Sequence, residues 1–260
     1  MLDGLRLATG LLTVFPVRPP AEISPRLART AMLLAPVAVL PLALLAALAG
    51  WGALLLGLPA LLAGVLVVAA MALGTRAMHI DGLADTVDAL GSGGDRERAL
   101  AIMKTGDIGP MGVTALVLVL LAQVAASSVL LGRDWGWLLL ATLLVASRAA
   151  LSFGCITRVP AARPSGLGAL VAGSVPVVAA VGLWVFSGSV VTLVARLSGQ
   201  SFWLPIVGMM VAAVVAIGLV QVAIKRFGGI TGDVLGALVE VSATVLLLFA
   251  SVSAPAPLVG

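Results

Sequence analysis

The sequence has very little charge and almost none of the residues that serve thiol or imidazole chemistry. Only 10% of its 260 residues are charged, and it contains one cysteine and one histidine. Soluble domains average about 25% charged residues. A single cysteine also rules out an internal disulfide and any cysteine-rich metal site. The composition therefore excludes an ordinary soluble domain and a disulfide-stabilised one.

Long apolar stretches take the place of the missing charge. The chain is 61% hydrophobic and its mean hydropathy is +1.21. Stretches of about 18–22 apolar residues are long enough to cross a hydrocarbon core of ~30 Å. We predict seven spans, at residues 30–49, 52–73, 111–131, 136–154, 168–188, 202–223 and 234–252. The expected fold is an all-α, polytopic membrane helix bundle that forms one domain over residues 1–260, with its longest polar segment at 75–110.

The basic residues predict how this bundle is oriented. Twelve of the fifteen Lys and Arg residues fall in connections on one side, two fall on the other, and Arg148 lies within a span. Because cytoplasmic connections are enriched in Lys and Arg, we expect the N-terminus and the 75–110 segment to face the cytoplasm. Topology thus accounts for the net charge of +4, so membrane lipid is an expected partner and nucleic acid is not.

Three aspartates directly after an apolar run form the most informative motif. On a helix, Asp81, Asp85 and Asp88 fall within an arc of about 60°. Carboxylates on one face repel each other, and no Lys or Arg lies among these three. A bound divalent cation removes this repulsion, and all-oxygen ligands suit Mg²⁺. The alternative is a solvated helix end at the membrane surface.

The single histidine precedes this triplet. On the same helix His79 lies about 160° away from Asp81, so it is not an obvious fourth ligand. It either forms a local hydrogen bond or, if Gly82 breaks the helix, turns inward as a catalytic group.

Two further polar stretches are candidates for phosphate binding. A glycine loop at 91–94 precedes a short helix that carries Arg96 and ends near Lys104, and a second loop carries Arg163. Backbone N–H groups and cations of this kind can cradle phosphates. Ordinary surface loops with topogenic charges are the alternative.

The last motif lies at the start of the final span. Thr231 and Asp233 precede Glu240, and the two acidic residues share one helix face about 20° wide. Glu240 falls about two turns inside an apolar span, so it should meet a cation, a metal or a cavity. Arg148 also lies within a span, and it is a functional candidate unless its side chain reaches the membrane interface. Asp233 either joins the site or caps its helix. We count Thr231 and Glu240 as substrate-binding candidates.

These residues favour phosphoryl transfer over transport. A metal held by carboxylates, with arginines and glycine loops on one membrane face, suits charge neutralisation on a diphosphate. The main alternative is an ion-coupled transporter, in which charge within the membrane marks an ion path. The acidic residues cluster at one edge instead, and no pair of broken spans occupies matching positions of two halves.

The stretch His79–Asp88 closely resembles the signature of the cobalamin synthase family, the adenosylcobinamide-GDP ribazoletransferases. Its DGxxDxxD core alone would also fit CDP-alcohol phosphotransferases, which remain the alternative. Four more blocks resemble the former family in the same order: Phe15-Pro16-Val17, Ile102-Met103-Lys104 with Ile108-Gly109, Ala162-Arg163 with Gly166-Leu167-Gly168, and residues 229–237.

The resemblance implies a specific reaction. Adenosylcobinamide-GDP and α-ribazole, or α-ribazole 5′-phosphate, would give adenosylcobalamin or its phosphate and GMP, with Mg²⁺, at the cytoplasmic (inner) membrane of a bacterium or archaeon. The oligomeric state stays open, and a homo-oligomer is possible.

The same resemblance suggests a role for each candidate residue. Asp81, Asp85 and Asp88 would hold the metal, and Asp233 or His79 would accept the proton of the attacking hydroxyl. The phosphates would be bound by three basic residues, Arg96, Lys104 and Arg163.

Overall fold

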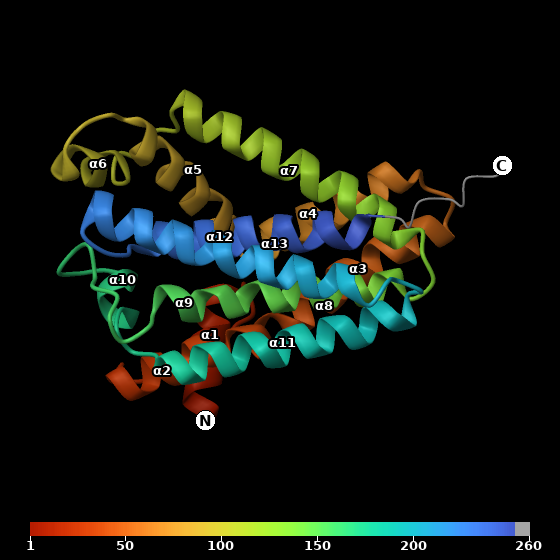
Figure 1. Ribbon diagram of the computed structural model, residues 1–260, viewed down its shortest axis with the longest axis horizontal. Coiled ribbons are helices and arrows are strands. Elements are labelled where there is room, and N and C mark those ends of the chain that lie inside the picture. The colour runs from red at the N-terminus through yellow and green to blue at the C-terminus, as the bar shows by residue number, and fades with distance from the viewer. Residues whose placement is uncertain (253–260) are drawn as a thin grey trace.

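The computed structural model describes residues 1–252, and it arranges them as a bundle of helices that run mostly along one axis (Figure 1). The helices are α1 (Leu2–Leu12), α2 (Pro25–Leu33), α3 (Ala35–Leu55), α4 (Ala60–Gly74), α5 (Met78–Gly91), α6 (Arg96–Ile102), α7 (Pro110–Leu131), α8 (Gly136–Ser147), η1 (Arg148–Ala150), α9 (Leu151–Gly154), α10 (Leu167–Val171), α11 (Val177–Leu197), α12 (Trp203–Phe227) and α13 (Gly232–Ser251). Among the described residues, β pairing is limited to two isolated bridges.

Within residues 1–252, six helical segments are long and apolar enough to cross a membrane, and the bent pair α4–α5 makes a seventh if it is counted as one span. The six are α2 with α3, α7, α8 through α9, α11, α12 and α13. The prediction of an all-α, polytopic membrane protein is confirmed. The spans expected at 111–131, 136–154 and 234–252 match their helices to within two residues at each end.

The first hairpin was predicted in the wrong place. The sequence suggests a turn at Gly50 and Trp51, but α3 continues through both residues to Leu55. A Cβ on Gly50 would lie 2.9 Å from a methyl carbon of Leu131, so this glycine serves close helix packing rather than a turn. The chain reverses at residues 56–59, where Gly57 adopts a φ of +86°.

The span predicted at 168–188 is also displaced. The structure places α11 nine residues later, and the preceding apolar stretch forms the one-turn helix α10 and a loop. Gly173 in that loop has a φ of +68°, and Pro176 precedes the first turn of α11. Because the residues on both sides of this break are apolar, hydropathy alone did not reveal it.

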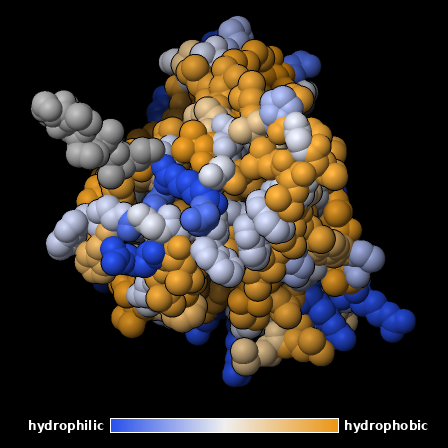
Figure 2. All heavy atoms as spheres, turned by 90° about the vertical axis from the view of Figure 1, so that its right-hand side faces the viewer, coloured by the Kyte–Doolittle hydropathy of each residue, from blue (hydrophilic) through white to orange (hydrophobic). Residues whose placement is uncertain are grey.

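Helix α13 is the centre of the bundle. It packs against α5, α7, α8 and α12, and Figure 1 shows it running through the middle of the molecule. Its Leu238, Leu246 and Leu247 are among the largest fully buried side chains. The short helices α6 and α10 gather at one end of the bundle, whereas Figure 2 shows apolar surface around a central group of hydrophilic residues at the opposite end. The polar segments around α6 and α10 therefore lie together at one end.

A sharp break separates α4 from α5. The two helices are bent by 88°, and both Arg76 and Ala77 adopt a φ of 55°, in the left-handed region. Arg76 Nη2 donates to the carbonyl of Gly10 (3.0 Å), and the Val14 N–H donates to Gly74 (2.8 Å). The N-terminal segment thus braces the break, which directs α5 across the bundle towards α13.

Ala77→Gly should stabilise the protein, because glycine removes the left-handed strain of roughly 1–2 kcal/mol that an L side chain has there. We expect the free energy of unfolding to rise by roughly 0.5–1 kcal/mol, measured by thermal unfolding in detergent. Ala72→Gly in the last turn of α4 is the matched control and should lower it by about 1 kcal/mol. An equal loss in both variants would contradict this account of the break.

Candidate active site

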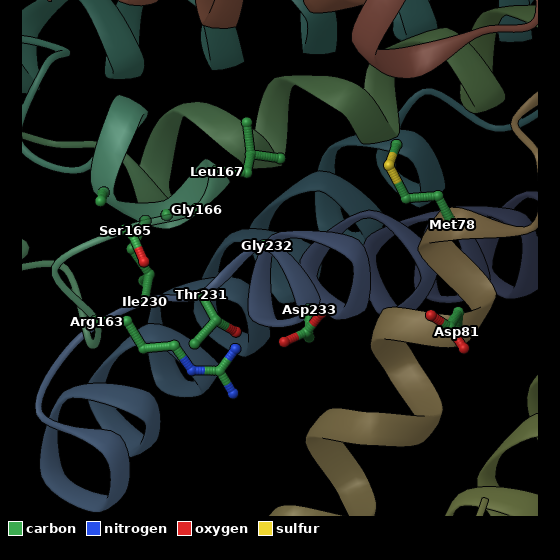
Figure 3. Close-up of a pocket in the computed structure, with 12 residues that line it drawn as sticks. Met78, Asp81, Arg163, Ser165, Gly166, Leu167, Ile230, Thr231, Gly232 and Asp233 are labelled. Atoms are coloured by element: carbon green, nitrogen blue, oxygen red, sulfur yellow. The ribbon is translucent and has the colours of Figure 1, made fainter. Parts of the chain in front are cut away.

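A cavity of about 270 Å³ lies where α5 crosses the beginning of α13. It is lined by Met78 and Asp81 of α5, by Arg163 with residues 165–169, and by residues 230–233. Figure 3 shows Asp233 between Arg163 on one side and Asp81 on the other. Three stretches that are far apart in the sequence, each of them noted for its polar residues, therefore form one site.

Two glycines allow this close crossing of helices. A Cβ on Gly82 would lie 2.7 Å from the carbonyl oxygen of Asp233, and a Cβ on Gly236 would lie 3.1 Å from the Cα of His79. Real Cβ atoms do not approach backbone as closely as the first distance, so α5 and α13 would have to separate if Gly82 had a side chain. The glycine in the DGLAD motif is thus needed for packing, and it does not break the helix.

The loop that carries Arg163 is fixed to the start of α13 by backbone pairing. The Ala162 N–H donates to Ile230 O and the Ile230 N–H donates to Pro160 O, both at 2.9 Å. Gly168 continues this contact, because a Cβ there would lie 2.6 Å from the carbonyl oxygen of Ile230. The guanidinium of Arg163 is thereby held close to the α13 carboxylate.

Negative charge accumulates around the cavity. Asp85, one turn after Asp81 on α5, lies within electrostatic range of Asp81, Asp88 and Asp233, and Arg163 is the cation that opposes them. Asp85 itself is only 9% exposed, so water screens this repulsion poorly. The arrangement has a surplus of carboxylate oxygens and is suited to bind a cation.

Asp88 binds backbone N–H groups instead of facing the other carboxylates. Its Oδ2 accepts from the N–H of Gly109 (2.7 Å) and its Oδ1 accepts from the N–H of Gly112 (2.8 Å). These N–H groups belong to the beginning of α7, where a helix leaves its first amides unpaired and carries partial positive charge. Asp88 therefore joins the end of α5 to the beginning of α7.

The carboxylates around the cavity do not form a complete metal-binding site in this arrangement. Over residues 1–252, no three His, Cys, Asp or Glu side chains are grouped closely enough to hold an ion. The donor chemistry nevertheless fits Mg²⁺, since Asp81, Asp85 and Asp233 supply only oxygen atoms and their charge exceeds that of the nearby arginine. The side chains of α5 and α13 would have to converge to hold an ion.

Thr231 acts as the N-cap of α13. Its Oγ1 accepts from the Val234 N–H (3.2 Å) and donates to the Sδ of Met103 (3.8 Å). Met103 follows α6, so this hydroxyl also links the polar segment to the cavity. Asp233 occupies the first turn of α13, where the N–H groups of the helix favour negative charge.

Three arginines tie the α6 segment to the rest of the protein through backbone carbonyls. Arg163 Nη2 donates to Leu100 O (2.7 Å), Arg96 Nη2 to Ala162 O (3.0 Å), and Arg226 Nη1 to Gly94 O (2.8 Å). Only Arg163 of these lines the cavity. Arg96 and Lys104, two expected phosphate ligands, lie outside it, and Lys104 is exposed after the end of α6.

His79 and Glu240 also lie outside the main cavity. His79 is 2% exposed, faces an adjoining space of about 20 Å³, and has no hydrogen-bond partner for either ring nitrogen within the described chain. Glu240 is two turns further along α13, where its Oε2 accepts from Gln123 Nε2 (2.8 Å). The structure thus brings Asp81, Asp233, Thr231 and Arg163 together and leaves these two residues deeper in the bundle.

Sequence reasoning missed the partners of these groups. Gln123 is a lone amide inside the apolar helix α7, and its polarity within a span was the signal that could have found it. The use of Asp88 by Gly109 and Gly112 had no such signal, since it depends on how α5 meets α7.

Comparison with known proteins decides the family. The model of the family described as cobalamin-5-phosphate synthase matches residues 4–251. The chain belongs to this family. A relative from Nocardioides sp., an adenosylcobinamide-GDP ribazoletransferase, is 43% identical over 95% of this chain and 98% of its own. Proteins of the same name from Frankia casuarinae and Pseudomonas entomophila are 38% and 40% identical, over 99% and 90% of this chain and 97% and 92% of theirs. No solved structure gives a significant match.

Family membership confirms the resemblance seen in the blocks around residues 79–88, 162–168 and 229–237. The same blocks provide most of the cavity's lining. Three of the five blocks that resemble the cobalamin-5-phosphate synthase family are therefore gathered at one place, where α5, the 160–168 loop and α13 meet.

Gly82→Ala should destabilise the protein by roughly 1–3 kcal/mol, because its Cβ would push against the backbone of Asp233. Thermal unfolding in detergent measures this loss. Gly218→Ala on α12 is the matched control, since a Cβ there meets no atom within 4 Å, and it should not destabilise. If both variants unfold at the same temperature, the close crossing is not what the glycine provides.

Proposed function

We propose that the protein transfers the cobinamide phosphate moiety of adenosylcobinamide-GDP to α-ribazole or α-ribazole 5′-phosphate, releasing GMP. The product is adenosylcobalamin or its 5′-phosphate, so the reaction assembles the nucleotide loop. Support comes from the family match over residues 4–251. It also comes from relatives named adenosylcobinamide-GDP ribazoletransferase, which are matched over 98% and 97% of their length. The observation that carries the proposal is the cavity in which Asp81, Asp233 and Arg163 meet.

In this proposal Mg²⁺ would be held by Asp81 and Asp85 of α5 together with one carboxylate oxygen of Asp233 of α13. When bound, the ion would neutralise charge that develops on the diphosphate and on the departing GMP. Asp88 was expected to be a third ligand from α5, but we assign it to the α7 terminus, because both of its oxygens already accept backbone N–H groups.

Arg163 binds a phosphate group of the substrate. Its Nε is buried without a hydrogen-bond partner in the described chain, and its planar fork suits two oxygens of one phosphate. A cavity of about 270 Å³ is below the usual size for a drug-sized ligand. It accommodates the diphosphate and adjoining sugar, while the corrinoid and guanine lie outside it.

The carboxylate oxygen of Asp233 that does not bind the ion would accept the proton of the attacking ribazole hydroxyl. A general base has to reach the proton it removes, and Asp233 lines the cavity whereas His79 faces the smaller adjoining space. His79 then contributes to packing between α5 and α13.

The reaction takes place at the cytoplasmic face of the inner membrane. The connections that carry twelve of the fifteen basic residues include the 75–110 segment, and such connections are retained in the cytoplasm. Nucleotide substrates are present on that side. Binding of membrane lipid and assembly into a homo-oligomer stay predictions.

Asp81→Asn should lower turnover about 10³-fold or more, because it removes one charged oxygen ligand and leaves the fold intact. The assay measures GMP released by purified protein from adenosylcobinamide-GDP and α-ribazole, with and without Mg²⁺. Asp134→Asn, an exposed aspartate on another loop, is the matched control and should retain full turnover. Near-normal activity of Asp81→Asn would exclude the metal assignment. Turnover with CDP-diacylglycerol and an alcohol would contradict the proposed substrates and indicate a CDP-alcohol phosphotransferase activity.

Asp233→Asn should change the pH–rate profile as well as the rate. A carboxylate base loses activity as it is protonated, so the unaltered enzyme should slow at acidic pH, and the variant should lack this acidic limb. The profile of kcat against pH measures this. An acidic limb that persists unchanged in the variant would assign the base to another group.

A further inference from the structure

A second polar cluster lies inside the bundle, apart from the cavity. Arg148, at the junction of α8 and η1, is 2% exposed, and Glu240 of α13 is 8% exposed. Charged groups within a membrane span are unfavourable unless they are paired or face a cavity. Over residues 1–252 the one ion pair within 4 Å joins Arg6 and Asp3 on the surface, so Arg148 and Glu240 are not a direct pair.

Each charge is held by uncharged groups instead. Arg148 Nη1 donates to Leu144 O (2.8 Å) and to Ser147 Oγ (2.9 Å), whereas its Nε has no partner in the described chain. Glu240 Oε2 accepts from Gln123 Nε2, which also donates to Thr244 Oγ1 (3.1 Å). The charge of Glu240 acts on Arg148, and the charge of Arg148 acts on His79.

The cluster connects α13, whose first turn lines the cavity, to two neighbouring segments of the bundle. Gln123 belongs to α7, Arg148 to the α8–η1 junction and Glu240 to α13, while His79 is on α5, two residues before Asp81. Glu240 follows Asp233 by two helical turns on the same face of α13, a rise of about 10 Å. A rotation of α13 that moved Glu240 away from Gln123 would also turn Asp233 away from Asp81.

We propose that Gln123, Arg148 and Glu240 are positioning residues that fix the rotation of α13 against α5 and α7, and thereby the relative placement of the Asp81 and Asp233 carboxylates. Apolar contacts between membrane helices are tolerant of rotation, because lipid and side chains are equally apolar. The hydrogen bond between Gln123 and Glu240 joins α7 to α13 and forms in one arrangement only, so it selects that arrangement. The hydrogen bonds of Arg148 stay within its own helix, and Arg148 acts on Glu240 through its charge. The expected effect on catalysis rests on the function proposed above, whereas the geometric part of the inference does not.

The test replaces the cluster by apolar residues of similar size, in the triple variant Gln123→Leu, Arg148→Met and Glu240→Leu. Removing a buried charge together with its counterpart is often neutral for stability. We therefore expect the thermal midpoint in detergent to stay close to that of the unaltered protein, while kcat falls about 10–100-fold and KM changes less than about threefold.

A second readout does not depend on activity. Spin labels at Ser92→Cys, which caps the end of α5, and at Leu248→Cys, exposed on α13, report the distance between the two helices in a Cys155→Ala background. The triple variant should shift or broaden the distribution of this distance. Ser242→Ala is the matched control, because Ser242 is a buried polar residue of α13 with no hydrogen-bond partner in the described chain. It should change neither kcat nor the distance.

Each outcome is decisive. A triple variant with normal kcat and an unchanged distance distribution overturns the proposal, and so does a lower kcat with an unchanged distribution. If the triple variant does not fold, Gln123→Leu alone removes the hydrogen bond and leaves both charges, and it should give the same two changes to a smaller extent. If the unaltered protein releases no GMP, the proposed function fails, while the distance measurement still tests the positioning role.

Discussion

The close crossing of α5 and α13 is the contact on which the rest of the structure depends. Gly82 and Gly236 let the two backbones approach, and the 88° break after α4 directs α5 towards that crossing. Without this crossing, apolar side chains would separate Asp81 on α5 from Asp233 on α13. Two small residues and a strained turn therefore place carboxylates from distant parts of the chain around one cavity.

The polar end of the bundle is stabilised by arginines that bind backbone carbonyls rather than carboxylates. Arg96, Arg163 and Arg226 each donate to a carbonyl across the junction between the α6 segment and the loops near α13. This leaves the aspartates without basic partners apart from Arg163, which is what a cation-binding site requires. Arg163 donates a hydrogen bond to Leu100 of α6 and also lines the cavity. Binding of a phosphate to Arg163 would therefore affect the position of α6.

Much of the fold and part of the site could be predicted from sequence, because hydropathy and helical spacing are local properties. The apolar stretches predicted the bundle, and the spacing of the three aspartates predicted that they share a helix. Spacing could not reveal that Asp88 is used by the amides of α7, or that Glu240 meets Gln123. These contacts depend on how helices pack, as does the role of Gly50, which looks like a turn residue and is a packing residue.

The central claim is that one cation is held by carboxylates from both helices, not by the α5 triplet alone. Titration of purified protein with Mn²⁺, which prefers the same oxygen ligands as Mg²⁺, measures this by electron paramagnetic resonance without any substrate. Asp81→Asn and Asp233→Asn should each weaken Mn²⁺ binding about tenfold or more, and Asp134→Asn should not. Binding by Asp233→Asn that equals that of the unaltered protein would contradict the account.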